Sequence, residues 1–160
     1  MDFLGIESIE EYRENEGKRT RIYWENGRIV ALKNRAETVI RKIALCYGKT
    51  PQAIRAAWKL KMKDESRRYT PLFISRVLNF IPVKTPFGKS YVNVAYNTDV
   101  LGSAIRFLRS GRKLMCVWKE RTLRRRMLSA MRYAIKDEIR RKREEESLNN
   151  LDVDWYLKNV

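Results

Sequence analysis

The stretch "AIRFLRSGRKLMCVW", residues 104–118, alternates apolar and polar side chains on either side of Ser110-Gly111. This pattern predicts two strands joined by a tight turn. The next stretch, "KERTLRRRMLSAMRYAIKDEIRRKREEE" (residues 119–146), instead places Leu123, Met127 and Met131 at helical spacing. A change of period from two to about 3.6 within one continuous segment predicts an α+β fold.

The predicted C-terminal helix, over about 120–146, has two halves. Leu123, Met127 and Met131 form an apolar stripe, and Leu128, Ala134 and Ile135 lie in or beside it. The apolar residues end at Ile139. Beyond that point the sequence "RRKREEESLNN" offers no apolar face that a core could use. We therefore expect the first half of the helix to pack against the sheet and the second half to extend into water.

Three features earlier in the chain predict a hairpin and two helices. "RIYWENGRIVAL" places Asn26-Gly27 between two apolar runs, which is typical of a β-hairpin. A helix is predicted over 34–47, where Asn34 and Glu37 have the spacing of a capping box. A short basic helix is predicted over about 50–62, where Thr50 is the N-cap and proline follows it.

The segment between these helices and the opening stretch is predicted to be extended. "FISRVLNFIPV" and "YVNVAY" have strand character, and Pro82 confines the end of the first to an edge or a turn. "PVKTPFGKS" is predicted to be a loop between them. The fold class that follows is α+β, a small mostly antiparallel sheet with the short basic helix and the long C-terminal helix.

The predicted organisation is one domain with two appendages. Residues 1–20 are rich in charge and are expected to be a loosely ordered N-terminal segment. Residues 21–146 form the single domain, for which a chain of 160 residues is long enough. Residues 147–160 are a C-terminal tail.

The charge balance is the strongest functional signal. Lys and Arg number 35 against 19 acidic residues, which gives a formal net charge of +16 and a pI of about 10.1. Such an excess repels itself in a compact state and usually serves a polyanionic partner. Nucleic acid is the first expectation and an anionic membrane surface the second.

Several classes of protein are disfavoured. No apolar run approaches the ~20 residues that cross a bilayer, and the acidic N-terminus lacks a signal peptide's basic region, so we expect a cytoplasmic protein. Without histidine or a close cysteine pair, zinc sites are not expected, and Cys46 and Cys116 are predicted to be buried, reduced thiols. No catalytic constellation or phosphate-cradling loop is recognisable, and Asp152 and Asp154 are read as solvation of the tail. We expect no enzyme, cofactor or metal.

Basic residues in three clusters are candidates for phosphate contacts. One cluster precedes the strands, one lies at the Ser-Gly turn and one begins the last helix. For each residue the alternative to a phosphate contact is a place on a solvated basic face. Lys84 and Lys89 flank Pro86, Phe87 and Gly88, where a cationic loop with an apolar wedge would suit a narrow minor groove. The three clusters are Arg67 and Arg68, Arg112 and Lys113, and Arg124, Arg125 and Arg126.

The succession of these segments resembles the competence transcription factor ComK family. The resemblance runs from about Arg41 to Arg132, through "RKIALCYGKTPQAIRAAWKLKMK", "TPLFISRVLNFIPVKTP", "GKSYVNVAY", "IRFLRSGRKLMCVW" and "ERTLRRRMLSAMR". It implies a bacterial, nucleoid-associated activator that binds paired A/T tracts of double-stranded DNA, largely through the minor groove, as a homo-oligomer. It also implies RNA polymerase and a protease adaptor as partners. The chain departs from the family in a shorter N-terminus and a different tail.

Several alternatives stay open. Helices 34–47 and 50–62 could form a helix-turn-helix that places Lys49, Gln52 and Arg55 in the major groove. The protein could bind structured RNA or the ribosome, or antagonise an activator by joining ComK-like oligomers. The tail residues Trp155, Tyr156 and Leu157 could dock a partner or a neighbouring subunit, or return to the chain's own core.

Overall fold

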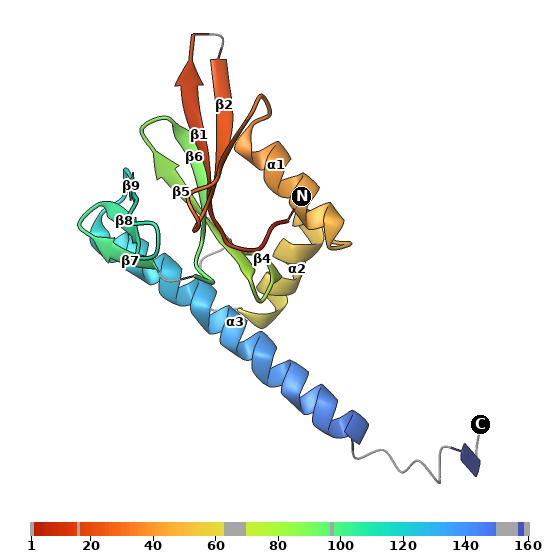
Figure 1. Ribbon diagram of the computed structural model, residues 1–160. Helices are drawn as coiled ribbons and strands as arrows, with labels where there is room; N and C mark the ends of the chain where they lie inside the picture. The colour runs from red at the N-terminus through yellow and green to blue at the C-terminus, as the bar shows by residue number, and fades with distance from the viewer. Residues whose placement is uncertain (1, 16, 63–69, 97, 150–156, 159–160) are drawn as a thin grey trace.

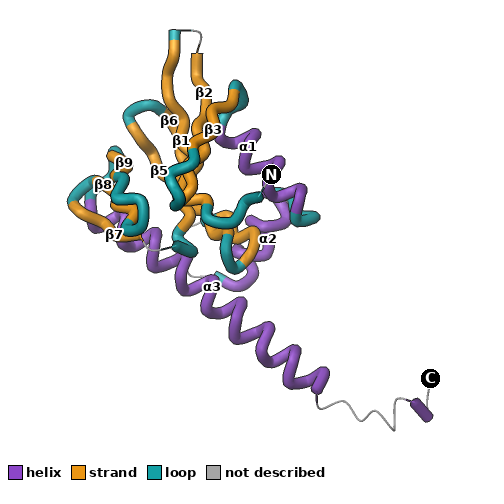
Figure 2. The backbone as a smooth tube through the Cα atoms, in the orientation of Figure 1, coloured by secondary structure: helices purple, strands orange, loops and turns teal. Residues whose placement is uncertain are grey.

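The computed structural model describes residues 2–15, 17–62, 70–96, 98–149 and 157–158. It contains a six-stranded antiparallel sheet in the order β3-β2-β1-β6-β5-β4 and a three-stranded sheet in the order β7-β8-β9 (Figures 1 and 2). The elements are β1 (Ile6–Glu14), β2 (Gly17–Trp24), β3 (Ile29–Leu32), α1 (Ala36–Cys46), α2 (Pro51–Lys61), β4 (Leu72–Ser75), β5 (Leu78–Thr85), β6 (Gly88–Asn93), β7 (Thr98–Leu101), β8 (Ala104–Phe107), β9 (Lys113–Met115) and α3 (Glu120–Asn149). The predicted α+β class, with its short helix and long C-terminal helix, is confirmed.

The acidic N-terminal stretch forms an inner strand of the large sheet. β1 pairs with β2 on one side and with β6 on the other, where Ser8 lies opposite Val92. The expectation that residues 1–20 are a loosely ordered segment is therefore wrong for the part described, and a boundary at residue 20 would cut through β2. A β-bulge between Ile6 and Ser8 breaks the alternation of side chains, which hid the strand in the sequence.

Both predicted turn dipeptides lie in hairpins. Gly27 has φ +89° in the β2–β3 connection, where the Trp24 amide donates to the Arg28 carbonyl. Gly111 has φ +76° between β8 and β9, and Ile105 pairs with Leu114 as the alternation predicts. In each loop the glycine occupies the left-handed region that other residues avoid.

The two helices α1 and α2 cover one face of the large sheet (Figure 1). Their apolar residues, among them Ile40, Ile43 and Ile54, are buried with strand residues such as Ile9 and Phe80. α2 begins as predicted, because the Thr50 hydroxyl accepts from the Ala53 amide at 3.2 Å. The capping box predicted at Asn34 is wrong: Arg35 is the N-cap of α1, and it makes no side-chain cap hydrogen bond.

The small sheet and the first half of α3 cover the opposite face. Val92, Ile105 and Leu123 belong to one buried cluster that joins β6, β8 and α3. The Asn79 side chain donates to the Ala130 carbonyl at 3.1 Å, which ties β5 to α3. The large sheet therefore has packed elements on both faces, and on this second face they cover β5 and β6.

The C-terminal part of α3 leaves the body and projects into solvent (Figure 1), and residues 142–147 are all exposed. The predicted division of this helix into a packed and a solvated half is confirmed. Leu123 and Met127 are buried as predicted, but the packed face then turns away from the predicted stripe, because Met131 is exposed while Ala130 and Tyr133 are buried. No helix in the described part of the chain is long and apolar enough to cross a membrane.

Candidate nucleic-acid interface

The segment predicted as the loop "PVKTPFGKS" is a tight hairpin. β5 and β6 continue to the tip, where Thr85 pairs with Gly88, so only Pro86 and Phe87 form the turn. The Thr85 hydroxyl fastens it by accepting from the Phe87 amide at 3.3 Å and donating to the Gly88 carbonyl at 2.9 Å. The prediction of a loop is wrong because the residues on either side of Pro86 and Phe87 belong to the paired strands β5 and β6.

This hairpin gathers two of the predicted lysines. Lys84 and Lys89 are direct cross-strand partners, so both side chains leave the same face of the sheet next to the turn. Both are exposed, and the Phe87 ring between them is 56% exposed. The Lys89 ammonium also lies 5.6 Å from the centre of the Tyr91 ring.

Two further cations join this pair from other elements. Lys18 of β2 and Arg35 before α1 both approach the buried carboxylate of Glu11, at 3.9 Å and 3.6 Å. The Ala36 amide at the start of α1 donates to the same carboxylate at 3.3 Å. We call Lys18, Arg35, Lys84 and Lys89 the hairpin-tip cluster. With Glu11 its formal charge is 4 − 1 = +3.

Gly88 allows the hairpin tip to approach this carboxylate. A Cβ atom at position 88 would lie 2.5 Å from Glu11 Oε2 and 3.3 Å from Lys18 Nζ. The glycine also has φ +142°, which other residues rarely adopt. The backbone of the turn therefore lies directly beside the charges of β1 and β2.

Tyr91 lies beneath the cluster with its hydroxyl buried and without a hydrogen-bond partner among the described residues. Burial raises its pKa to about 12, and the negative charges of Glu37 and Glu11 add to the effect. The positive charge of Arg55, a half-buried residue of α2, opposes the shift. The phenol stays neutral under all physiological conditions.

The remaining sequence-predicted residues do not form one surface. Arg112 is not available for phosphate, because it contacts Glu10 at 3.0 Å and Ser8 at 2.8 Å and stacks over Tyr23 at 3.6 Å. Lys113 is exposed on the small sheet beside Arg106. Of the two candidate phosphate contacts at the Ser-Gly turn, Lys113 is thus exposed, whereas Arg112 is held in contacts with its own chain.

The three arginines that open α3 point in different directions. Successive residues of a helix are about 100° apart, so no single phosphate can contact all three. Arg124 donates to the Val100 carbonyl at 2.7 Å, and Arg126 lies over the Trp118 ring at 4.8 Å. Of the three, Arg125 is the one whose side chain leaves the body.

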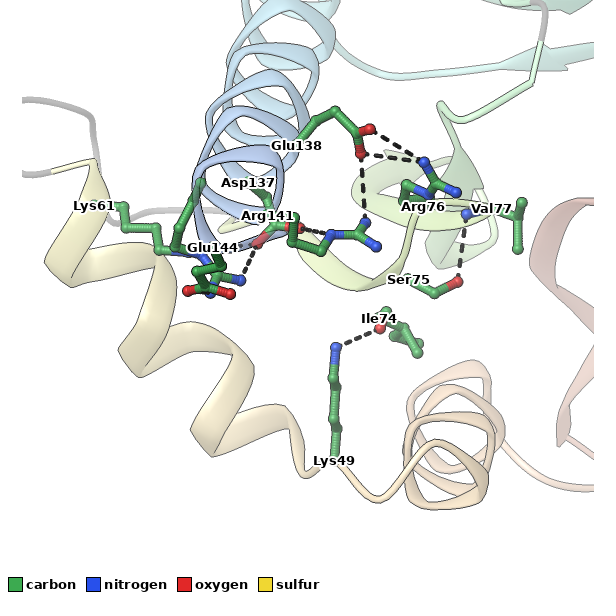
Figure 3. A network of polar contacts seen from close by, with 11 residues as sticks. Lys49, Lys61, Ile74, Ser75, Arg76, Val77, Asp137, Glu138, Arg141 and Glu144 are labelled. Carbon is green, nitrogen blue, oxygen red and sulfur yellow. Dashed lines mark hydrogen bonds and ion pairs between the residues drawn. The ribbon is translucent and has the colours of Figure 1, made fainter. Parts of the chain in front are cut away.

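The helix-turn-helix alternative gains no support from its side chains. The Lys49 ammonium donates to the Ile74 carbonyl at 2.6 Å, and Arg55 is half-buried near Tyr91 (Figure 3). Gln52 is exposed. Four sequence-predicted residues, Arg67, Arg68, Trp155 and Tyr156, lie outside the described residues, and Leu157 is exposed.

A groove of about 480 Å³ lies between α2, the β4–β5 turn and α3, and it is strongly charged (Figure 3). Its centre is Asp137, which meets Arg140 at 2.9 Å, Arg141 at 3.2 Å and Lys61 at 3.5 Å. Burial acts to raise the pKa of Asp137, but these cations outweigh it and hold the pKa below its usual value. Each cation here already has an acceptor, so the network joins α2 to α3.

The prediction that both cysteines are buried is wrong for Cys46. It is exposed at the end of α1, whereas Cys116 is buried as predicted, and both are free thiols. In the described part of the chain no group of three or more carboxylate or thiol side chains could hold a metal ion.

Comparisons with known proteins add no identification: no family model, curated protein or solved structure matches the chain. The resemblance to the ComK family stays a prediction drawn from residue patterns.

Proposed function

We propose that the protein is a sequence-selective regulator of the ComK type that binds A/T-rich double-stranded DNA, with the hairpin-tip cluster as its main contact. The observation that carries the proposal is the pair Lys84 and Lys89 on either side of the exposed Phe87 at a hairpin tip. Nucleoid association and oligomerisation belong to the same proposal.

The chemistry of this tip suits a narrow groove between two phosphate backbones. A/T-rich tracts have a narrow minor groove whose negative potential attracts inserted cations. A hairpin of two strands is slim enough to approach it, and an apolar side chain at the tip can open a base step. Lys18 and Arg35, set back from the tip, would then face the flanking phosphates.

The cluster owes its net charge mainly to Lys84 and Lys89, which are exposed and have no ion pair with any of the described residues. Several cations elsewhere are paired with acids, as Arg76 is with Glu138 at 3.2 Å and Arg109 with Glu25 at 3.1 Å. At the tip, Lys18 and Arg35 share one carboxylate, that of Glu11. A polyanion therefore gains more from this surface than from a salt-bridged one.

The proposal is tested by fluorescence anisotropy with a labelled A/T-rich duplex between about 50 and 200 mM salt. The variant Lys84→Gln/Lys89→Gln should bind at least about tenfold more weakly, and the slope of log K against log salt should shrink by about 1.8. The matched control, Lys59→Gln/Lys113→Gln, removes the same charge from exposed lysines on α2 and β9. Equal losses in the two variants would contradict the assignment to the hairpin tip.

The same assay distinguishes the alternatives. Replacing A·T by I·C pairs keeps the minor-groove face and changes the major-groove face. Retained affinity supports the minor groove, and lost affinity would favour the helix-turn-helix with Gln52. Tighter binding to structured RNA than to the duplex would favour an RNA-binding or ribosome-associated protein instead.

A further inference from the structure

The part of α3 that packs on the body carries a row of positive charge on its solvent side. Four exposed cations follow one another at intervals of four, seven and four residues, which places them in one narrow strip over about 22 Å of helix. We call Arg121, Arg125, Arg132 and Lys136 the α3 ridge. No acidic residue lies three or four positions from any of them along the chain, so no neighbour on the same face of the helix neutralises the row.

Cations near the end of the same helix are paired in a different way. Arg140 meets Asp137 at 2.9 Å and Glu144 at 2.7 Å, which is the alternation of charge typical of a solvated helix. In the α3 ridge, residues four positions apart carry like charges, and these repel each other. Cations in the first turn also oppose the helix dipole, which favours anions there. The ridge therefore destabilises the free helix, and a bound polyanion would remove that penalty.

An open hollow of about 730 Å³ lies at the start of the ridge. Its lining residues are Glu120, Arg121, Arg124, Arg125, Leu128 and Arg132. Arg124 is occupied within the chain, because it donates to the Val100 carbonyl at 2.7 Å and to Glu120 at 2.9 Å. Arg121 and Arg125 are exposed and have no ion pair with any described residue. Four arginines and one acid give the hollow a formal charge of 4 − 1 = +3, which suits a phosphate group held by guanidinium groups.

The ridge and the hairpin-tip cluster lie on opposite sides of the large sheet. Lys89 lies two residues from Tyr91 on β6, so both side chains leave the face on which α1 packs, and Lys84 pairs with Lys89. α3 packs on the other face, where Leu123 is buried with Val92. Helical spacing places the ridge on the side of α3 away from Leu123. The two basic surfaces therefore face in opposite directions, and each can meet a duplex segment of its own.

We infer that the α3 ridge binds the sugar–phosphate backbone of double-stranded DNA, so that one chain bridges two duplex segments. The segment at the hairpin tip rests on the proposed function, and the segment on α3 is the addition. A row of like charges matches a backbone that repeats the opposite charge at regular intervals, and each neutralised phosphate releases counterions. Backbone contacts carry no base information, so the ridge should bind A/T-rich and G/C-rich duplexes alike.

A capture assay with the full chain tests the bridge. Beads carry an A/T-rich duplex, and retention of a labelled G/C-rich duplex is measured at about 100 mM salt. Arg121→Gln/Arg125→Gln should lower this retention at least about tenfold, and the slope of log K against log salt for the G/C-rich duplex should shrink by about 1.8. The control Lys59→Gln/Lys113→Gln removes the same charge from exposed lysines on other elements and should keep most of the retention. Equal losses in the two variants would overturn the inference.

The outcomes separate this inference from the proposed function. A wild-type chain that binds the A/T-rich duplex but captures no second duplex overturns the inference alone. Capture that needs Lys84 and Lys89 but not Arg121 and Arg125 would show that two hairpin tips of an oligomer form the bridge, and it would overturn the inference too. Duplex binding that is lost in Arg121→Gln/Arg125→Gln but kept in Lys84→Gln/Lys89→Gln would support the ridge and contradict the assignment to the hairpin tip.

Two further measurements test other roles for the same arginines. Arg121→Gln/Arg125→Gln should melt at or above the wild-type temperature in circular dichroism, because two like charges four residues apart are removed. A lower melting temperature would assign the arginines to the stability of the fold. Cosedimentation with phosphatidylglycerol vesicles that needs these arginines, with duplex capture unchanged, would assign the ridge to a lipid surface. Either result would overturn the inference.

Discussion

Arg112 is predicted to be a stabilising residue rather than a DNA contact, and its replacement measures the difference. Its guanidinium meets Glu10 at 3.0 Å and Glu7 at 3.7 Å, and it lies over the rings of Tyr23 at 3.6 Å and Phe107 at 4.8 Å. Arg112→Met would leave two largely buried carboxylates without this cation. Breaking a buried pair in this way costs about 3–5 kcal/mol.

The partial exposure of Arg112 favours the lower end of that range. Its side chain is 25% exposed, so water relieves some of the unpaired charge. We expect a loss of about 3 kcal/mol in the free energy of unfolding. For a chain of this length that loss lowers the melting temperature by about 6–12 °C. Urea unfolding followed by circular dichroism at pH 7 measures the change.

A neighbouring arginine provides the matched control. Arg109 is 61% exposed and pairs with Glu25 alone, so Arg109→Gln should cost less than about 1 kcal/mol. Adding Glu7→Gln and Glu10→Gln to Arg112→Met should recover much of the loss, because no buried charge is then left unpaired. Unfolding of the Arg112 and Arg109 variants at the same urea concentration would contradict a stabilising role for Arg112. A loss of duplex binding by the folded Arg112→Met variant would contradict it as well.

Three smaller predictions concern titratable groups. Cys46 should react with a thiol reagent in the native protein at pH 8 while Cys116 does not, since burial raises the pKa of Cys116 to about 11; two reactive thiols before unfolding would contradict the structure. The pKa of Asp137 is lower in the folded state than in the unfolded state, where it is near 3.8. The ionised carboxylate therefore stabilises the folded protein at pH values above 3.8, and this stabilisation is lost as the pH falls through the pKa of the folded state. The free energy of unfolding of Asp137→Asn should therefore vary less with pH in that acidic range than that of the wild-type chain. An unchanged pH dependence would show that Asp137 does not cause the loss of stability in acid. Tyr91→Phe should not destabilise the protein, because it removes a buried hydroxyl without a partner; a loss above about 1 kcal/mol would show that the hydroxyl is bonded.

The sequence predicts those parts of the fold that are encoded locally. Gly27 and Gly111 identify their hairpins because each turn needs a residue with positive φ, and Thr50 identifies the start of α2 because its hydroxyl caps the helix. β1 was missed because its bulge disrupts the alternation and because Glu7, Ser8 and Glu11 are polar residues at buried positions. α3 has apolar residues on two sides, and local spacing alone does not tell which side meets the sheets.

The candidate site depends on contacts that are distant along the chain. Lys84 and Lys89 were recognised because they are close in sequence, but Lys18 and Arg35 join them only through the pairing of β1 with β6. Arg112 and Lys113 look equivalent in the sequence, yet one side chain points into an ion network and the other into solvent. Neighbouring residues on a strand point to opposite faces, so a basic cluster in the sequence is not yet a basic surface.

The proposed function requires that the cations at the hairpin tip recognise A/T-rich duplexes. Selection of bound molecules from a pool of random duplexes at about 150 mM salt tests it most directly, with the Lys84→Gln/Lys89→Gln variant run in parallel. We predict that paired A and T tracts are enriched by the wild-type chain and not by the variant. Enrichment of G/C-rich sequences, or no retention of any duplex at this salt concentration, would contradict the claim.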